Sequence, residues 1–128
     1  MKRLREKAAS SESYPYKVSS CLKLSNGGIF WGVNSPKTHP ISLFLNPWRR
    51  ERVGTHAEMR SLVNAVNRFR GDRSVLEGSR IYVVRLKRDG DLGMARPCPI
   101  CEGLLRHHGV KQATFSDREG NFDRVLYG

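Results

Sequence analysis

The sequence predicts an α/β fold in which helices flank a mixed five-stranded sheet, within one domain over residues 1–128. First, strand-like and helical periodicities alternate through the second half of the chain, as in proteins that bury parallel strands. Second, Asn26-Gly27-Gly28 is a turn signal between two strand-like runs. Third, only about five residues join the last two strands, which leaves no room for a crossover helix and favours an antiparallel hairpin.

The first part of the chain is expected to form one helix and two paired strands. Residues 2 to about 12 favour a helix with a basic face. Residues 16–24 alternate well enough for a strand, and residues 29–33 are its expected partner. Residues 34–54 contain several prolines and no clear period, which predicts a long loop, and long ordered loops are usually functional.

The clearest helical pattern in the chain runs from Thr55 to about Arg70, and Gly71 is expected to end it. Its apolar stripe consists of Met59, Leu62, Val63, Val66 and Phe69. The remaining elements are a buried strand over 80–87, a polar loop over 88–96, a helix over 98–108 and two strands over 111–116 and 122–127.

Two short motifs lie at the starts of the two predicted helices in this part of the chain. One is His56-Ala57-Glu58, and the other is Pro97-Cys98-Pro99-Ile100-Cys101. One imidazole and two thiols supply three zinc ligands, one fewer than a closed structural site needs. Three ligands leave the fourth tetrahedral position to water, which is typical of a catalytic zinc site. We therefore expect Zn²⁺ bound by His56, Cys98 and Cys101.

The residue types suit hydrolytic removal of an exocyclic amine from a base. Zinc lowers the pKa of water toward ~7, so hydroxide is available at neutral pH to attack C4 of cytosine or C6 of adenine. The ring nitrogen must then gain a proton, and ammonia must leave. One carboxylate can make each proton transfer, and we assign that role to Glu58, which would not be a zinc ligand.

Simpler interpretations exist for each motif alone. Thr55-x-x-Glu58 is also a capping-box pattern at a helix start. A lone Cys-x-x-Cys can be a redox pair or half of a structural zinc site, although the sequence has no second such pair. The two motifs in this order, each at a helix start, favour the catalytic interpretation.

In these motifs the chain resembles the cytidine deaminase superfamily. The resemblance implies a five-stranded mixed sheet that carries two zinc-binding helices, and it favours cytosine over adenine. Gly32-Val33-Asn34 is similar to the family's Gly-x-Asn, which implies that Asn34 contacts sugar or base. The segment Pro36-Lys37-Thr38-His39-Pro40 looks like that of small phage and bacterial deaminases, so Lys37 and His39 are candidate substrate contacts. A turn asparagine and a solvated loop are the alternatives.

The resemblance gives conflicting indications of the subfamily. Nucleotide, transfer-RNA and polynucleotide deaminases usually have histidine at the position of His56, where small nucleoside deaminases usually have cysteine. The expected hairpin of the last two strands is instead typical of cytidine deaminases and bacterial toxin deaminases. The polar loop over 88–96 is a third departure, because the preceding strand usually runs almost directly into Pro-Cys.

Charge is the main indication of the substrate. The formal net charge is +11, and Arg49, Arg50 and Arg52 follow Trp48 just before the first zinc-ligand motif. Basic residues beside an aromatic suit a single strand that stacks its bases and presents phosphates. We therefore expect these four residues to contact DNA, with cytosine in DNA as the substrate. A free nucleotide such as dCMP, or cytidine, is the first alternative, and a non-catalytic nucleic-acid-binding zinc module is the second.

Composition limits the setting. The chain has no long apolar run and no signal-peptide pattern, so we expect a cytoplasmic protein with no membrane partner. Two of the three cysteines are assigned to zinc, and Cys21 is expected to be a buried free thiol. The sequence leaves the oligomeric state open.

Overall fold

The computed structural model describes residues 2–9, 17–34 and 56–127. Its elements are α1 (Lys2–Ala9), β1 (Lys17–Lys23), β2 (Ile29–Val33), α3 (Ala57–Arg68), the 3₁₀ helix η1 (Arg73–Leu76), β3 (Arg80–Leu86), β4 (Leu92–Gly93), α4 (Pro99–His107), β5 (Gln112–Ser116) and β6 (Phe122–Leu126). Every strand and helix expected within these ranges is present, which confirms the predicted α/β class.

The strands form one mixed sheet in the order β2-β1-β3-β5-β6, and β4 pairs with β3 outside this path. Strands β3 and β5 are parallel, and every other pair is antiparallel. The five predicted strands are confirmed, and β4 is a sixth within the predicted polar loop. It pairs only Leu92 and Gly93 with the end of β3, which is too short to give a periodic pattern in the sequence.

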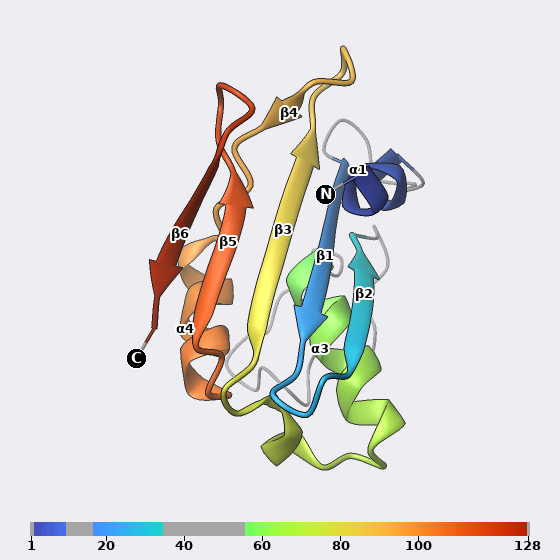
Figure 1. Cartoon of the computed structure of the whole chain (residues 1–128), viewed down its shortest axis with the longest axis vertical. Helices are drawn as coiled ribbons and strands as arrows, with labels where there is room; N and C mark the ends of the chain where they lie inside the picture. The colour runs from blue at the N-terminus through green and yellow to red at the C-terminus, as the bar shows by residue number, and fades with distance from the viewer. Residues whose placement is uncertain (1, 10–16, 35–55, 128) are drawn as a thin grey trace.

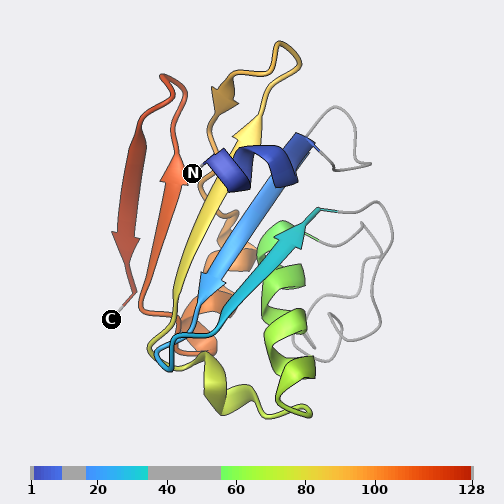
Figure 2. The same cartoon turned by 45° about the vertical axis from the view of Figure 1, so that its right-hand side comes forward.

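Helices cover the two faces of the sheet unequally. In Figures 1 and 2, α3 and α4 lie behind the sheet, whereas α1 crosses the front near one end. The main core lies between the sheet and the helices α3 and α4, and its largest fully buried side chains include Leu22, Leu62, Ile81 and Leu105. A smaller cluster under α1 contains Leu4, Ala8, Val84 and Leu86.

The last two strands form the predicted antiparallel hairpin. Its turn is closed by the side chain of Asp117, whose carboxylate accepts hydrogen bonds from the backbone N–H groups of Glu119 and Asn121. The turn spans five residues, so β6 returns directly beside β5 and no helix intervenes. The hairpin was one of the two indications of subfamily that conflicted in the sequence, and the structure contains it.

Helix α3 ends at Arg68, two residues before the predicted end, and the chain turns away through Arg70, which has a φ of 57°, and Gly71. The backbone of Gly71 has a φ of 89°, a left-handed conformation that glycine adopts without steric cost. The short helix η1 that follows was not predicted. Asp72 caps it by accepting a hydrogen bond from the backbone N–H of Ser74.

None of the described helices is long and apolar enough to cross a membrane.

Candidate metal centre and active site

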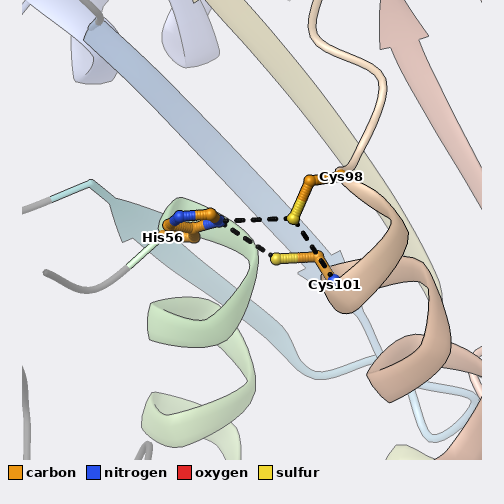
Figure 3. A group of neighbouring side chains, drawn as sticks. All are labelled: His56, Cys98 and Cys101. Atoms are coloured by element: carbon orange, nitrogen blue, oxygen red, sulfur yellow. Dashed lines mark hydrogen bonds between the residues drawn. The ribbon is translucent and has the colours of Figure 1, made fainter. Parts of the chain in front are cut away.

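The three predicted zinc ligands lie together between the starts of α3 and α4 (Figure 3). The Nδ1 atom of His56 lies 3.2 Å from the Sγ of Cys101 and 3.8 Å from the Sγ of Cys98. All three candidate ligand atoms lie within 4.8 Å of one another. Among the described residues, this is the one group of three or more His, Cys, Asp or Glu side chains found close enough together to share a metal ion.

These distances fit a zinc ion. Ideal tetrahedral zinc with its usual bond lengths to nitrogen and sulfur places those two ligand atoms about 3.6 Å apart. The two N···S distances, 3.2 and 3.8 Å, lie on either side of this value. Cys101 is buried, whereas His56 and Cys98 are only half-buried. The three side chains are thus positioned to bind zinc.

Both helix starts direct positive electrostatic potential at this group. His56 is the N-cap of α3 and Cys98 is the N-cap of α4. The Sγ of Cys98 accepts a hydrogen bond of 3.4 Å from the backbone N–H of Cys101. Hydrogen bonding by the Cys101 side chain, and then by His56, lowers the pKa of Cys98 to about 3. The thiolate, which is the metal-binding form, is therefore already favoured before metal arrives.

Glu58 is buried beside the three ligands, with only 6% of its surface exposed. Burial raises the pKa of its carboxyl group, because the charged form loses hydration. The nearby His56 and a hydrogen bond with the Cys101 side chain act in the opposite direction. A buried carboxyl group of raised pKa next to a metal-ligand group is suited to exchanging protons.

The capping-box interpretation of Glu58 does not fit this geometry. The N-cap of α3 is His56, so Glu58 occupies the second helical position, whereas a capping box needs the acidic residue at the third. A capping side chain would also lie at the surface, and this one is buried. Thr55, the other half of that pattern, lies outside the described residues.

Two residues to which the sequence assigned no role hold the start of α3 against the sheet. The hydroxyl group of Ser20 in β1 donates a 2.6 Å hydrogen bond to the carbonyl oxygen of Ala57. Gly32 in β2 packs against the same carbonyl group, where a Cβ atom would overlap it. Ser20 is fully buried on the inward side of β1, so a small polar residue at an inward strand position was the available signal.

The segment that carries Cys98 is tied to the sheet in a similar way. The backbone N–H of Ala95 donates a 2.9 Å hydrogen bond to the carbonyl oxygen of Ser116, the last residue of β5. Arg96 forms a 2.7 Å ion pair with Glu102 in the first turn of α4. Because Arg96 is half exposed, we attribute a positioning role to this pair and little stability.

Asn34 is the one predicted substrate-contact residue that the structure describes. Its side-chain oxygen accepts a 3.0 Å hydrogen bond from the backbone N–H of Val18, and its own N–H donates to the carbonyl oxygen of Val18. These bonds extend the pairing of β1 and β2 by one residue, whereas the alternative for Asn34 was a turn asparagine. Its contact with substrate stays a prediction.

The other predicted contacts lie outside the described residues: Lys37, His39, Trp48, Arg49, Arg50 and Arg52. Their roles therefore stay predictions.

Cys21 is a free thiol in β1, as expected, although it is only half-buried. His107 and His108 lie at the end of α4 that is remote from the two cysteines.

The chain matches no protein-family model, and no curated protein matches it in sequence. Solved structures do match it. A cytidine deaminase from Burkholderia pseudomallei aligns over 99% of this chain and 89% of its own, with a TM-score of 0.67 and 19% identity. A cytidine deaminase from Mycobacterium leprae aligns over 96% and 87%, with a TM-score of 0.56 and 19% identity. A dCMP deaminase from the cyanophage S-TIM5 aligns over 91% and 79%, with a TM-score of 0.60 and 20% identity.

These similarities define the class of fold, since the identities are too low to carry more. The chain has the cytidine deaminase-like fold, and its His/Cys/Cys group is positioned to bind zinc. The predicted fold is confirmed, and the three predicted ligands lie close enough together to bind a metal ion.

Proposed function

We propose that this protein is a zinc-dependent deaminase that hydrolyses cytosine to uracil and releases ammonia. The observation that carries the proposal is the buried carboxyl group of Glu58 beside three converging metal ligands. A purely structural zinc site has no use for such a group, so this observation weighs against a non-catalytic zinc module. The matching fold of cytidine and dCMP deaminases supports the same reaction.

Each residue then has a definite part in the mechanism. His56, Cys98 and Cys101 hold the zinc ion, which lowers the pKa of water toward ~7 when it is bound. Glu58 accepts a proton from the attacking water and delivers it to the ring nitrogen of cytosine, and a second transfer lets the exocyclic amine leave as ammonia. Its raised pKa favours this role, because a carboxylate of ordinary pKa would hold the proton too weakly at neutral pH.

For the form of the substrate, we propose cytosine in DNA. The net charge of +11 supports a polyanion, and the run from Trp48 to Arg52 combines an aromatic ring with three cations. A free nucleotide or nucleoside is the second candidate, favoured by the solved structures, which are cytidine and dCMP deaminases. A base inside a duplex would first have to leave the stack, so single-stranded DNA is the form we expect to react first.

The test is to incubate the protein with dCMP, cytidine, single-stranded DNA and double-stranded DNA, and to assay each for uracil. The Glu58→Gln variant in parallel identifies any contaminating activity. Uracil in at least one substrate, absent with the variant, supports the proposed reaction. Absence of uracil from all four with the zinc-loaded protein would refute it.

A second comparison separates the two substrate forms. Neutralising Arg49, Arg50 and Arg52 together should weaken DNA binding and reduce its salt dependence. The slope of log affinity against log salt concentration should become shallower by up to ~0.7–0.9 for each phosphate that is no longer bound. Turnover of dCMP should change little, because the metal ligands are intact. If dCMP has the higher kcat/KM in the wild-type protein by about tenfold, a difference of about 1.4 kcal/mol, the DNA proposal is wrong.

A further inference from the structure

One half of the sheet face that carries α1 is not covered by any described helix. Helix α1 packs over one end of β1 and β3, where the hydroxyl group of Ser19 donates a hydrogen bond to the carbonyl oxygen of Leu4 and the side chains of Val84 and Leu86 are buried. Toward the other end, Figures 1 and 2 show the strands without a described helix in front of them. We call this half, together with the row of side chains that borders α1, the open face.

Strand register fixes which residues form the open face, because alternate side chains of a strand point to the same side. The row that borders α1 consists of Trp31, Cys21, Tyr82, Thr114 and Arg124, and the first three of these also pack against the cluster under that helix. The next row consists of Ile29, Lys23, Arg80, Gln112 and Leu126. The side chains between these rows, such as Leu22, Ile81 and Ala113, are buried in the main core on the opposite face.

The charge of the open face is all of one sign. Lys23, Arg80 and Arg124 are exposed, and neither row contains a carboxylate. None of these three cations forms an ion pair with a carboxylate of the described residues. These three cations, on β1, β3 and β6 of one sheet, make a surface that attracts a polyanion and repels an identical copy of itself.

The open face also carries aromatic rings. Trp31 and Tyr82 occupy the same row, separated only by Cys21 on the strand between them, so their backbones are about 10 Å apart. Both side chains are half-buried, because they pack against the cluster under α1, and each leaves part of its surface exposed. The guanidinium group of Arg3 in α1 lies 5.7 Å from the centre of the Trp31 ring, which adds a fourth cation at the edge of the same surface.

We propose that the open face binds single-stranded nucleic acid, with the cations contacting phosphates and the aromatic rings stacking on bases. Flat aromatic side chains interleaved with cations are the combination that unpaired bases and their backbone require. This surface lies on the opposite face of the sheet from α3 and α4, whose first turns carry the metal ligands. The proposal therefore goes beyond the deaminase function, and binding here does not require a base to enter the metal centre.

The test uses a fluorescently labelled oligothymidylate, which has no exocyclic amine to hydrolyse, so binding is measured without turnover. We compare the wild-type protein with a Lys23→Gln/Arg80→Gln/Arg124→Gln variant. The matched control is Arg68→Gln/Arg70→Gln/Arg118→Gln, which removes the same charge from exposed positions outside the open face. Affinity is measured by anisotropy over a series of salt concentrations.

If the proposal is right, the wild-type protein binds at low salt and its affinity falls steeply as salt rises. For the open-face variant, the slope of log affinity against log salt concentration should be shallower by about 2, because three phosphate contacts at ~0.7 each are lost for a single strand. The control variant should keep a slope near that of the wild type. Tyr82→Leu keeps an apolar side chain against the cluster under α1, at the border of the open face. It should weaken binding about fivefold or more, because the stacking ring is removed. Mononucleotide deamination by these variants should equal that of the wild type, so a failure of the proposed reaction is distinguished from a failure of this surface.

Four outcomes would overturn the proposal. The first is no binding by the wild-type protein at low salt, and the second is an equal reduction of slope in both triple variants, which would indicate net charge alone. The third is equal affinity for a duplex of the same length, which would exclude stacking. The fourth is that the open-face substitutions leave oligothymidylate binding unchanged but alter another property. That property would be the oligomeric state, measured by light scattering, or binding to anionic vesicles.

Discussion

The backbone of Gly32 in β2 lies directly against the carbonyl oxygen of Ala57, the first residue of α3. A Cβ atom at position 32 would overlap this oxygen and lie 2.5 Å from the backbone nitrogen of Ser61. Both neighbours are backbone atoms of one helix, so neither can rotate away. The absence of a side chain at Gly32 therefore determines how closely α3, with His56 and Glu58 at its start, approaches the sheet.

Gly32→Ala should consequently displace the start of α3 and destabilise the fold. The expected loss is about 1–3 kcal/mol, the range for overpacking a core, measured by chemical denaturation. Zinc affinity should fall as well, because His56 moves with the helix. Gly103→Ala is the matched control, since a Cβ atom there meets nothing within 4 Å, and it should leave stability unchanged or slightly raised. Equal effects of the two substitutions would contradict this account.

The purified protein should contain about one zinc ion per chain by elemental analysis. His56→Ala and Cys101→Ala should each lose zinc and thermal stability together, because metal binding and folding are coupled. Cys21→Ala serves as the control, since Cys21 lies in β1 and is not part of the ligand group. Full zinc occupancy in Cys101→Ala would show that the ligand assignment is wrong.

Glu58→Gln should separate proton transfer from metal binding. The variant should keep its zinc and its fold, while kcat falls by at least the ~10²–10⁴-fold typical of a positioned acid/base. The uncharged amide has similar size, and burial already penalises the charge of Glu58, so stability should be equal to or above that of the wild type. Near-native turnover by this variant would refute the role of Glu58.

In the metal-free protein, the alkylation rates of Cys98 and Cys21 should depend differently on pH, because their pKa values are shifted in opposite directions. Cys98, whose pKa is lowered to about 3, should react with iodoacetamide at a rate that stays nearly constant from mildly acidic to mildly alkaline pH. Cys21, whose pKa is raised by burial, should react faster as pH rises through this range. Peptide mass spectrometry after chelation measures both sites in one sample.

The lowered pKa of Cys98 should also make the stability of the metal-free protein depend on pH. Because the pKa of Cys98 is depressed in the folded state, its thiolate contributes stability above the ordinary value of 9.0. That contribution should disappear as pH falls from there toward about 3. Cys98→Ser should therefore flatten this part of the pH dependence in metal-free protein. An unchanged profile would contradict the assigned pKa shift.

The sequence by itself determined the features that depend on neighbours in the chain. The helical stripe, the turn at Asn26-Gly27-Gly28 and the short link between the last two strands each depend on local periodicity or chain length, and each predicted element is present. The stripe is buried from Met59 to Val66, but the inclusion of Phe69 was wrong, because this residue is the C-cap of α3 and is exposed. The sequence also singled out the three side chains that come together, because Cys98 and Cys101 are adjacent on one helical turn and His56 lies at the start of another helix.

Only the tertiary structure decided what depends on distant strands coming side by side. Strand β1 lies between β2 and β3, and this order sets Gly32 and Ser20 against Ala57. It also gathers Lys23, Arg80 and Arg124 on one face, although they are far apart in the chain. Periodicity shows which side of its own strand a residue occupies, but the neighbouring strand and its register are set by packing of the whole core, so these contacts could not be predicted from the sequence.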